Sequence, residues 1–215
     1  MDTNVIIHLY RSGKKQILFQ RFADGIYIYE QIRYVELENH GQDILEELDG
    51  DIADGKIILI TNEWLKDQGV LSLFNRRVQE HRLLYNSGDL GEVYAISAAE
   101  ILGAYSLITD DIKQGGPYMS LLQFDDNEIM PFTVVDVLLL NYLEGKTDAQ
   151  ETLDMFEAIN SGAELNWNFR SHYIKFIKRF WREPYQEKER EWMKKFCGKY
   201  KIKAKERLDE LRKLL

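Results

Sequence analysis

The chain has 215 residues, of which 45% are hydrophobic and 12% aromatic, which suits one domain with an extension. The single Cys197 excludes an intramolecular disulfide and a cysteine zinc site, and no apolar stretch or secretory signal points to a membrane, so we expect a cytoplasmic protein. The net charge of −8 is uneven: residues 164–215 carry +8 and residues 1–163 carry −16, which predicts an acidic partner for the C-terminal part or contact with the rest of the chain.

Apolar periodicity divides the first 161 residues into alternating helices and short strands. The predicted helices cover residues 4–10, 15–22, 30–48 with a break at Gly41, 62–74, 92–102, 134–143 and 147–159. The predicted strands cover residues 25–29, 56–61, 106–109 and 129–132, and Pro131 favours a sheet edge for the last of them. Thr147 is expected to cap the last helix, with Gln150 completing a capping box. The alternation predicts the α/β class, with a Rossmann-like parallel sheet and helices on both of its faces.

Two adjacent acids, Asp110 and Asp111, follow Thr109 at the end of the predicted third strand. Ligand sites in open α/β sheets form beyond the carboxyl ends of the strands. Neighbouring carboxylates repel each other, and a divalent cation with oxygen ligands would offset that repulsion. Alternatively, Asp110 caps the next helix and Asp111 faces water.

Three more acids stand beside apolar segments. Asp2 precedes the first predicted helix, and Glu36 lies next to the apolar stripe of a later one, with Glu38 as its competitor if the register differs. Asp89 and Glu92 stand three residues apart before an Ala-rich helix, a spacing that a helix N-cap explains equally well. A solvated helix acid is the alternative for Glu36.

These motifs come in a recognisable order: Asp-Thr-Asn at residues 2–4, Glu-Leu at 36–37, Asp-x-Gly-Glu at 89–92 and Thr-Asp-Asp at 109–111. The order resembles the PIN-domain family of metal-dependent nucleases over residues 1–161. The resemblance implies a PIN-type parallel sheet flanked by helices. It departs from the family at the first strand, because only Met1 precedes Asp2.

The resemblance also implies an activity and roles for the acids. It implies a Mg²⁺- or Mn²⁺-dependent endoribonuclease of the toxin or defence type, with an antitoxin as a protein partner. The implied catalytic residues are Asp2, Glu36, Glu92 and Asp111. The implied metal ligands are Asp2, Glu92, Asp110 and Asp111, and Asn4 and Thr109 would orient Asp2 and Asp111.

The C-terminal part, residues 162–215, is predicted to be a basic all-α extension that begins after Ser161. Aromatic and leucine stripes with basic opposite faces indicate helices that either dock on the acidic domain or clamp nucleic acid. The residues expected to contact nucleic acid are Arg170, Lys175, Lys178, Arg179, Arg182, Lys194 and Lys195.

Two other functions remain open from the sequence. One is a non-catalytic protein-interaction module on a PIN-like scaffold, which the nearly absent first strand and the large helical extension favour. The other is a structure-specific DNA nuclease, which would use similar carboxylates. The sequence does not separate RNA from DNA as the substrate, and it leaves a homodimer open.

Overall fold

The computed structural model describes residues 1–83, 90–113, 116–123 and 128–215, and most of them are helical. The α-helices are α1 (Thr3–Arg11), α2 (Gln16–Arg21), α3 (Leu37–His40), α4 (Leu45–Ala53), α5 (Asn62–Asp67), α6 (Leu71–Arg82), α7 (Leu90–Ile101), α8 (Pro117–Gln123), α9 (Val134–Glu144), α10 (Ala149–Gly162), α11 (Phe169–Ile177), α12 (Glu187–Lys199) and α13 (Ala204–Arg212). Two π-helical turns, η1 (Ile32–Glu36) and η3 (Lys178–Arg182), and one 3₁₀ turn, η2 (Gln42–Ile44), complete the helical elements in this part of the chain. None of the helices described here is long and apolar enough to span a bilayer.

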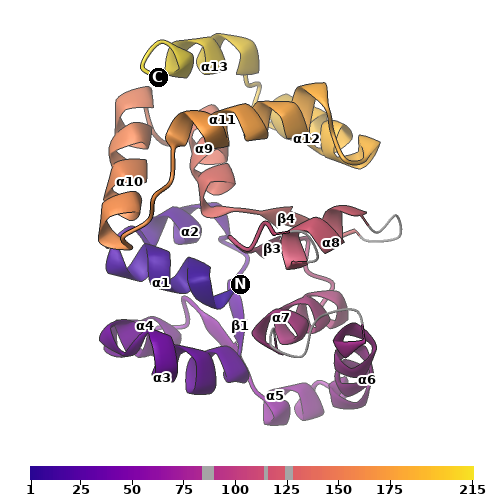
Figure 1. Cartoon of the computed structure of the whole chain (residues 1–215). Coiled ribbons are helices and arrows are strands. Elements are labelled where there is room, and N and C mark those ends of the chain that lie inside the picture. The colour runs from indigo at the N-terminus through magenta and orange to yellow at the C-terminus, as the bar shows by residue number, and fades with distance from the viewer. Residues whose placement is uncertain (84–89, 114–115, 124–127) are drawn as a thin grey trace.

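Four strands of three residues each cross the middle of the molecule: β1 (Tyr27–Tyr29), β2 (Ile58–Ile60), β3 (Ser106–Ile108) and β4 (Met130–Phe132). Helices α3 to α6 lie at one end and helices α9 to α13 at the other, with the N-terminus near the centre (Figure 1). The C-terminus lies beside α13, far from the N-terminus in this view.

The predicted PIN-type central sheet, a single parallel sheet flanked by helices, is wrong. The strands occur where the sequence placed them and pair in parallel, but they form two separate two-stranded sheets, β1 with β2 and β3 with β4. Met1 and Asp2 bridge the two sheets: the amino group of Met1 donates to the carbonyl of Tyr27 (3.1 Å), and the N–H of Asp2 donates to the carbonyl of Ile108 (3.0 Å). One bond on each side does not make a hydrogen-bonded ladder, so helices rather than a continuous sheet provide most of the framework.

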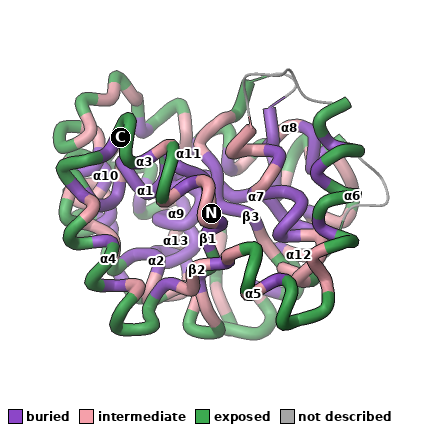
Figure 2. Tube along the Cα trace, turned by 90° about the horizontal axis from the view of Figure 1, so that it is seen from below, coloured by how far each residue is buried: buried purple, intermediate pink, exposed green. Residues whose placement is uncertain are grey.

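Helix α9 is the centre of the hydrophobic core. Every residue from position 134 to position 143 is buried, including the polar Asp136 and Asn141, as expected for a helix that is mostly apolar on every side. Its ends are well defined: Thr133 and Asp136 form a reciprocal capping box, and Gly145 ends the helix with φ +85°. Figure 2 shows α9 among the buried segments, with exposed turns around the periphery. The helix predicted for residues 134–143 is therefore confirmed.

Other predicted helix boundaries need small changes. Gly41 does interrupt the segment predicted as one helix, which consists of η1, α3, η2 and α4. The cap of α10 is Asp148 rather than Thr147: Asp148 accepts from the N–H of Glu151 (2.8 Å), and Glu151 accepts from the N–H of Asp148 (2.9 Å). An ionised cap gives the stronger, charge-assisted bond. The predicted cap at Asp89 lies outside the described residues.

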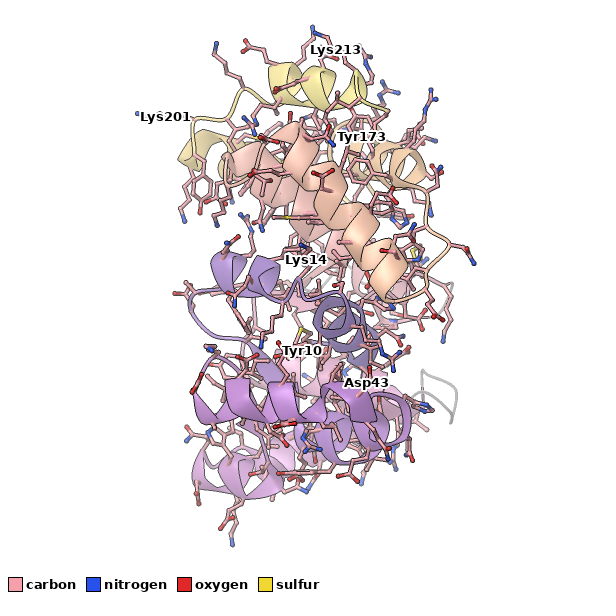
Figure 3. All side chains as sticks on the ribbon, turned by 90° about the vertical axis from the view of Figure 1, so that its left-hand side faces the viewer. Tyr10, Lys14, Asp43, Tyr173, Lys201 and Lys213 are labelled. Atoms are coloured by element: carbon pink, nitrogen blue, oxygen red, sulfur yellow. The ribbon has the colours of Figure 1, made fainter. Side chains whose placement is uncertain are left out.

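The C-terminal extension shares the core of the first 161 residues. Its buried aromatic and aliphatic side chains are Phe169, Tyr173, Phe176, Phe180, Met193, Phe196, Leu208 and Leu211. Tyr142 of α9 joins it to the rest of the chain by donating to the carbonyl of Arg207 (2.6 Å), and within the extension Tyr173 of α11 donates to the carbonyl of Leu208 on α13 (2.8 Å). Figure 3 shows Tyr173 in this upper layer and Tyr10 and Asp43 in the lower one. Removing the extension would therefore uncover part of the core.

Arg179 has to be removed from the residues expected to contact nucleic acid. Its side chain is only 4% exposed, and its Nη1 donates to Tyr118 Oη (2.7 Å) and Asp136 Oδ2 (3.1 Å). Its Nε donates to the fully buried Glu189. A buried charge is tolerated where it is paired and hydrogen-bonded, so Arg179 ties η3 to α9 and α12.

We expect Arg179→Met to destabilise the protein by about 3–5 kcal/mol, because it would leave the carboxylates of Asp136 and Glu189 buried without their cation. Urea unfolding followed by circular dichroism measures the change. Arg182→Met is the matched control, since Arg182 is exposed on the same turn and should change stability by less than about 0.5 kcal/mol. Equal effects of the two variants would contradict a structural role for the Arg179 network.

Candidate functional site

Asp2 is a buried carboxylate at the start of α1. Its backbone is held by the bond to Ile108 at the end of β3, and its Oδ2 accepts a hydrogen bond from Thr109 Oγ1 (2.8 Å). Burial raises the pKa of Asp2, and the charges of Asp110 and Glu36 raise it further, while the bond from Thr109 acts in the opposite direction. The ionised form of Asp2 is therefore unfavourable in the folded protein. Carboxyl groups with a shifted pKa of this kind are enriched at functional sites.

Thr109 connects Asp2 to the Thr-Asp-Asp motif. The hydroxyl of Thr109 is completely buried, donates to Asp2 and accepts from the backbone N–H of Asp111 (3.2 Å). One side chain thus orients Asp2 and fixes the turn that carries Asp111. Asn4, which was expected to help, is exposed, and no hydrogen bond between it and Asp2 occurs in the part of the chain that the structure describes.

Asp110 bonds to two other segments. Its Oδ1 accepts from the N–H of Val134, the first residue of α9 (2.9 Å), and its Oδ2 lies 2.9 Å from Nδ1 of His8 on α1. Asp110 therefore supports a helix N-terminus, where a negative charge is favourable. That helix is α9, however, and not α8, which comes next in the sequence.

Asp111 faces Glu92, which lies in the first turn of α7. The two carboxyl groups interact with each other, and the Nζ of Lys113 lies 2.8 Å from Asp111 Oδ2 and 3.8 Å from Glu92 Oε1. Burial acts to raise the pKa of Asp111, but the bonds with Glu92 and Lys113 outweigh it and lower the pKa. Lys113 therefore places one cation beside both acids, which offsets part of the repulsion between them. The side chain of Asp111 is 13% exposed, so it does not simply face water.

Glu36 closes the cluster from the side of η1. Its Oε2 accepts a hydrogen bond from the hydroxyl of Thr3, the neighbour of Asp2. A Cβ atom at Gly91 would lie only 1.8 Å from Glu36 Oε1, so the glycine of the Asp-x-Gly-Glu motif leaves the room that this carboxylate occupies. Glu38, the competing candidate, is exposed. Its Oε1 lies 3.6 Å from Nη1 of Arg33 rather than beside Thr3 or Gly91.

Five acids from four distant segments therefore lie in one neighbourhood around the N-terminus: Asp2, Glu36, Glu92, Asp110 and Asp111. They meet in pairs, and within the described residues no three carboxylate or imidazole groups converge on a single metal position. Mg²⁺ usually keeps several waters and takes one or two carboxylates from the protein, so the pair of Glu92 and Asp111 fits such an ion if Lys113 moves aside.

Three polar residues that contact these acids were not predicted from the sequence: Thr3, His8 and Lys113. Thr3 belongs to the Asp-Thr-Asn motif, and Lys113 stands two residues after Asp111, so proximity in sequence was the available signal. His8 had none, because its partner Asp110 is 102 residues away.

The extension approaches this site through aromatic rings. His8 packs edge-on against Trp167 (ring centroids 5.2 Å apart), and Trp167 lies 5.3 Å from His172 on α11. Burial lowers the pKa of His172, and the charge of Lys175 lowers it further, whereas Asp136 and Asp110 act in the opposite direction. The remaining candidates for nucleic-acid contact are exposed: Arg170, Lys175, Lys178, Arg182, Lys194 and Lys195.

Comparisons with known proteins add no assignment to this geometry. No family model matches the chain, and neither a curated protein nor a solved structure matches it.

Proposed function

We propose that the chain is a Mg²⁺- or Mn²⁺-dependent nuclease that cleaves RNA, as the PIN-domain resemblance of its acidic motifs implies. The observation that supports the proposal is the hydrogen-bonded series from Asp2 through Thr109 to Asp111, beside the pair of Asp111 and Glu92. Gathering like charges is unfavourable, and such clusters are enriched at functional sites. The absence of one continuous sheet from the described residues weighs against a close relation to PIN proteins, so the proposal rests on the acids and not on the fold.

The chain's own residues would divide the work. Glu92 and Asp111 would hold the cation, with Asp111 kept ionised by its lowered pKa. The bound cation would lower the pKa of a water molecule and offset charge on the scissile phosphate. Asp2, whose pKa is raised, would take the proton of the attacking water at its carboxylate, and Thr109 would keep that carboxylate in position.

The exposed cations of α11, η3 and α12 would recruit the substrate. Carboxylates repel a polyanion, so phosphate contacts must come from elsewhere. Lys175 stands one turn after His172, whose ring lies beside Trp167, and Trp167 packs in turn on His8; this face of α11 would guide the substrate toward the acids. A protein partner of the antitoxin type and a cytoplasmic location belong to the same proposal, since the half-buried thiol of Cys197 suits a reducing compartment.

The experiment is incubation of labelled RNA and DNA with the purified protein in Mn²⁺, in Mg²⁺ and in EDTA. We expect cleavage of RNA with either metal, none in EDTA, and a strong loss in Glu92→Gln, which keeps the side-chain size but removes a charged ligand. Equal cleavage by wild type and Glu92→Gln would show that a contaminating nuclease is responsible, and no cleavage by wild type would refute the proposal.

A non-catalytic interaction module is the second candidate, and one observation favours it. Protein groups already occupy the acids, with His8 on Asp110, Thr3 on Glu36 and Lys113 on Asp111. In that case Mn²⁺ titration by calorimetry should show no binding in wild type or in Glu92→Gln, whereas the nuclease proposal requires binding that Glu92→Gln weakens.

A further inference from the structure

A groove in the C-terminal extension lies between the α11–η3 segment and α13. Its volume is about 630 Å³. Its floor is apolar and consists of Tyr173, Ile174, Ile177, Trp181, Leu208 and Leu215. Tyr173, labelled in Figure 3, lies close to α13, and its hydroxyl bond to the carbonyl of Leu208 (2.8 Å) holds the two sides together.

Four of the six floor residues are aliphatic, and Ile174 is the most exposed of them. Ile174 is 44% exposed, which is high for a large apolar residue on a helix whose neighbours Tyr173 and Phe176 are buried. The two aromatic residues of the floor are engaged elsewhere: Tyr173 is buried, and Trp181 packs on the rings of Phe176 and Phe180. The groove thus offers mainly isoleucine and leucine surface, together with the half-buried ring of Trp181.

The rim of the groove is basic. Four cations line it, namely Arg170, Arg182, Lys205 and Arg212, against the single acid Asp209. Asp209 pairs with Arg212 (3.0 Å). Among the residues that the structure describes, Arg170, Arg182 and Lys205 form no ion pair, and all three are exposed. An apolar floor between unpaired cations calls for a partner with an apolar centre and acidic edges.

We propose that this groove binds an acidic amphipathic helix of a partner protein, with leucine-like residues on the floor and Asp or Glu against the rim. Helices that dock this way present apolar residues at i, i+3, i+4 and i+7, which would lie on the apolar floor between α11 and α13. Single-stranded nucleic acid would satisfy the cations, but its bases stack on exposed aromatic rings, and the floor has only the half-buried Trp181, which already packs on Phe176 and Phe180, beside the buried Tyr173. The inference does not depend on nuclease activity.

The probe is a labelled synthetic peptide of about four helical turns, with leucines on one stripe and glutamates elsewhere, followed by fluorescence anisotropy. Two further peptides serve as controls, one with the same composition scrambled to break the stripe and one with lysine in place of glutamate. We expect the striped acidic peptide to bind more tightly than both, and added salt to weaken it. The double variant Arg182→Glu/Lys205→Glu should weaken binding about tenfold or more.

Two variants separate the floor from the charge. Ile174→Asp should also weaken binding about tenfold, and it leaves the buried core intact because Ile174 is partly exposed. Lys66→Glu/Arg76→Glu reverses two exposed cations on α5 and α6, away from the groove, and should leave binding unchanged. Melting curves show whether each variant folds. If the charge-reversed rim variant does not fold, Arg182→Gln/Lys205→Gln takes its place and should also weaken binding.

Three results would overturn the inference. Equal binding of the scrambled peptide would show attraction by charge alone. Unchanged binding in both Ile174→Asp and the rim variants would place the peptide elsewhere. A single-stranded oligouridine that binds the wild type more tightly than the striped peptide, and loses affinity in Ile174→Asp, would assign the groove to nucleic acid.

Discussion

Replacing Asp111 by Asn should reduce metal-dependent RNA cleavage on the order of a hundredfold or more, because a ligand charge for the cation is lost. Asn keeps the size of the side chain and an oxygen that can accept the bond from Lys113, so the local structure should persist. Cleavage rates in Mn²⁺ at saturating RNA measure the effect. A variant that cleaves as fast as the wild type would remove Asp111 from the site.

The same variant should be slightly less stable than the wild type when both are measured in EDTA. Repulsion from Glu92 alone would make the ionised Asp111 unfavourable, and its loss would then raise stability. The pKa of Asp111 is lowered in the folded state, however, so the ionised form is favoured on balance by its partners, including Lys113, and its loss should lower stability. A depressed folded-state pKa contributes stability above the unfolded value of 3.8, and this contribution disappears as the pH falls through the folded value. The difference between Asn and Asp should therefore shrink in acid.

Asp54→Asn is the matched control for Asp111→Asn. Asp54 also pairs with a lysine two residues later, Lys56 (2.9 Å), but both side chains of this pair are exposed. An exposed ion pair contributes little, so this control should change neither cleavage nor stability measurably. A loss of cleavage in Asp54→Asn would mean that removing any negative charge impairs the assay.

Local patterns predicted the elements of the fold better than their assembly. The mostly apolar run of α9 and the short apolar runs of the four strands are visible in the sequence, since a segment packed in the core has few polar positions. Whether the four strands form one sheet depends instead on the segment between β1 and β3, which would have to pair with both of them over several residues. Two residues, Met1 and Asp2, occupy that place with one bond to each side, and no periodicity reveals such a count.

The site shows the same division. The order of motifs identified Asp2, Glu36, Glu92 and Asp111, which do lie near one another. It did not reveal Lys113 between two carboxyl groups, nor that Arg179 is buried against Asp136 and Glu189. The sequence alone does not distinguish a basic residue that faces water from one that pairs with a buried acid, because the acid comes from a distant segment of the chain.

Asp2→Asn should raise stability by about 1 kcal/mol or more near neutral pH, because like charges about 4 Å apart repel by about 1 kcal/mol in water and more strongly where they are buried. Burial, Asp110 and Glu36 all disfavour the ionised Asp2, and Asn removes the charge while its oxygen still accepts the hydroxyl of Thr109. A raised folded-state pKa contributes stability that is complete below the unfolded value of 3.8 and is lost as the pH rises through the folded value. The advantage of Asn should therefore grow from acid to neutral pH.

Urea unfolding of wild type and variant in EDTA at a series of pH values measures this dependence. Asp24→Asn provides the control, since Asp24 is an exposed loop acid and should give no pH-dependent difference. A variant less stable than wild type at neutral pH, or a difference that does not vary with pH, would contradict the repulsion that Asp2 is expected to experience.

Activity of the Asp2→Asn variant should move in the opposite direction, because an asparagine side chain can neither take a proton nor add negative charge to the site. The opposition between the two measurements is informative. An acid kept for structure, such as Asp136 beside Arg179, lowers stability when it is replaced. An acid that makes the protein less stable and yet is needed for cleavage is present because of its function, although its charge destabilises the fold. Loss of cleavage with a gain in stability would place Asp2 in the second group, and unchanged cleavage would remove it from the proposed mechanism.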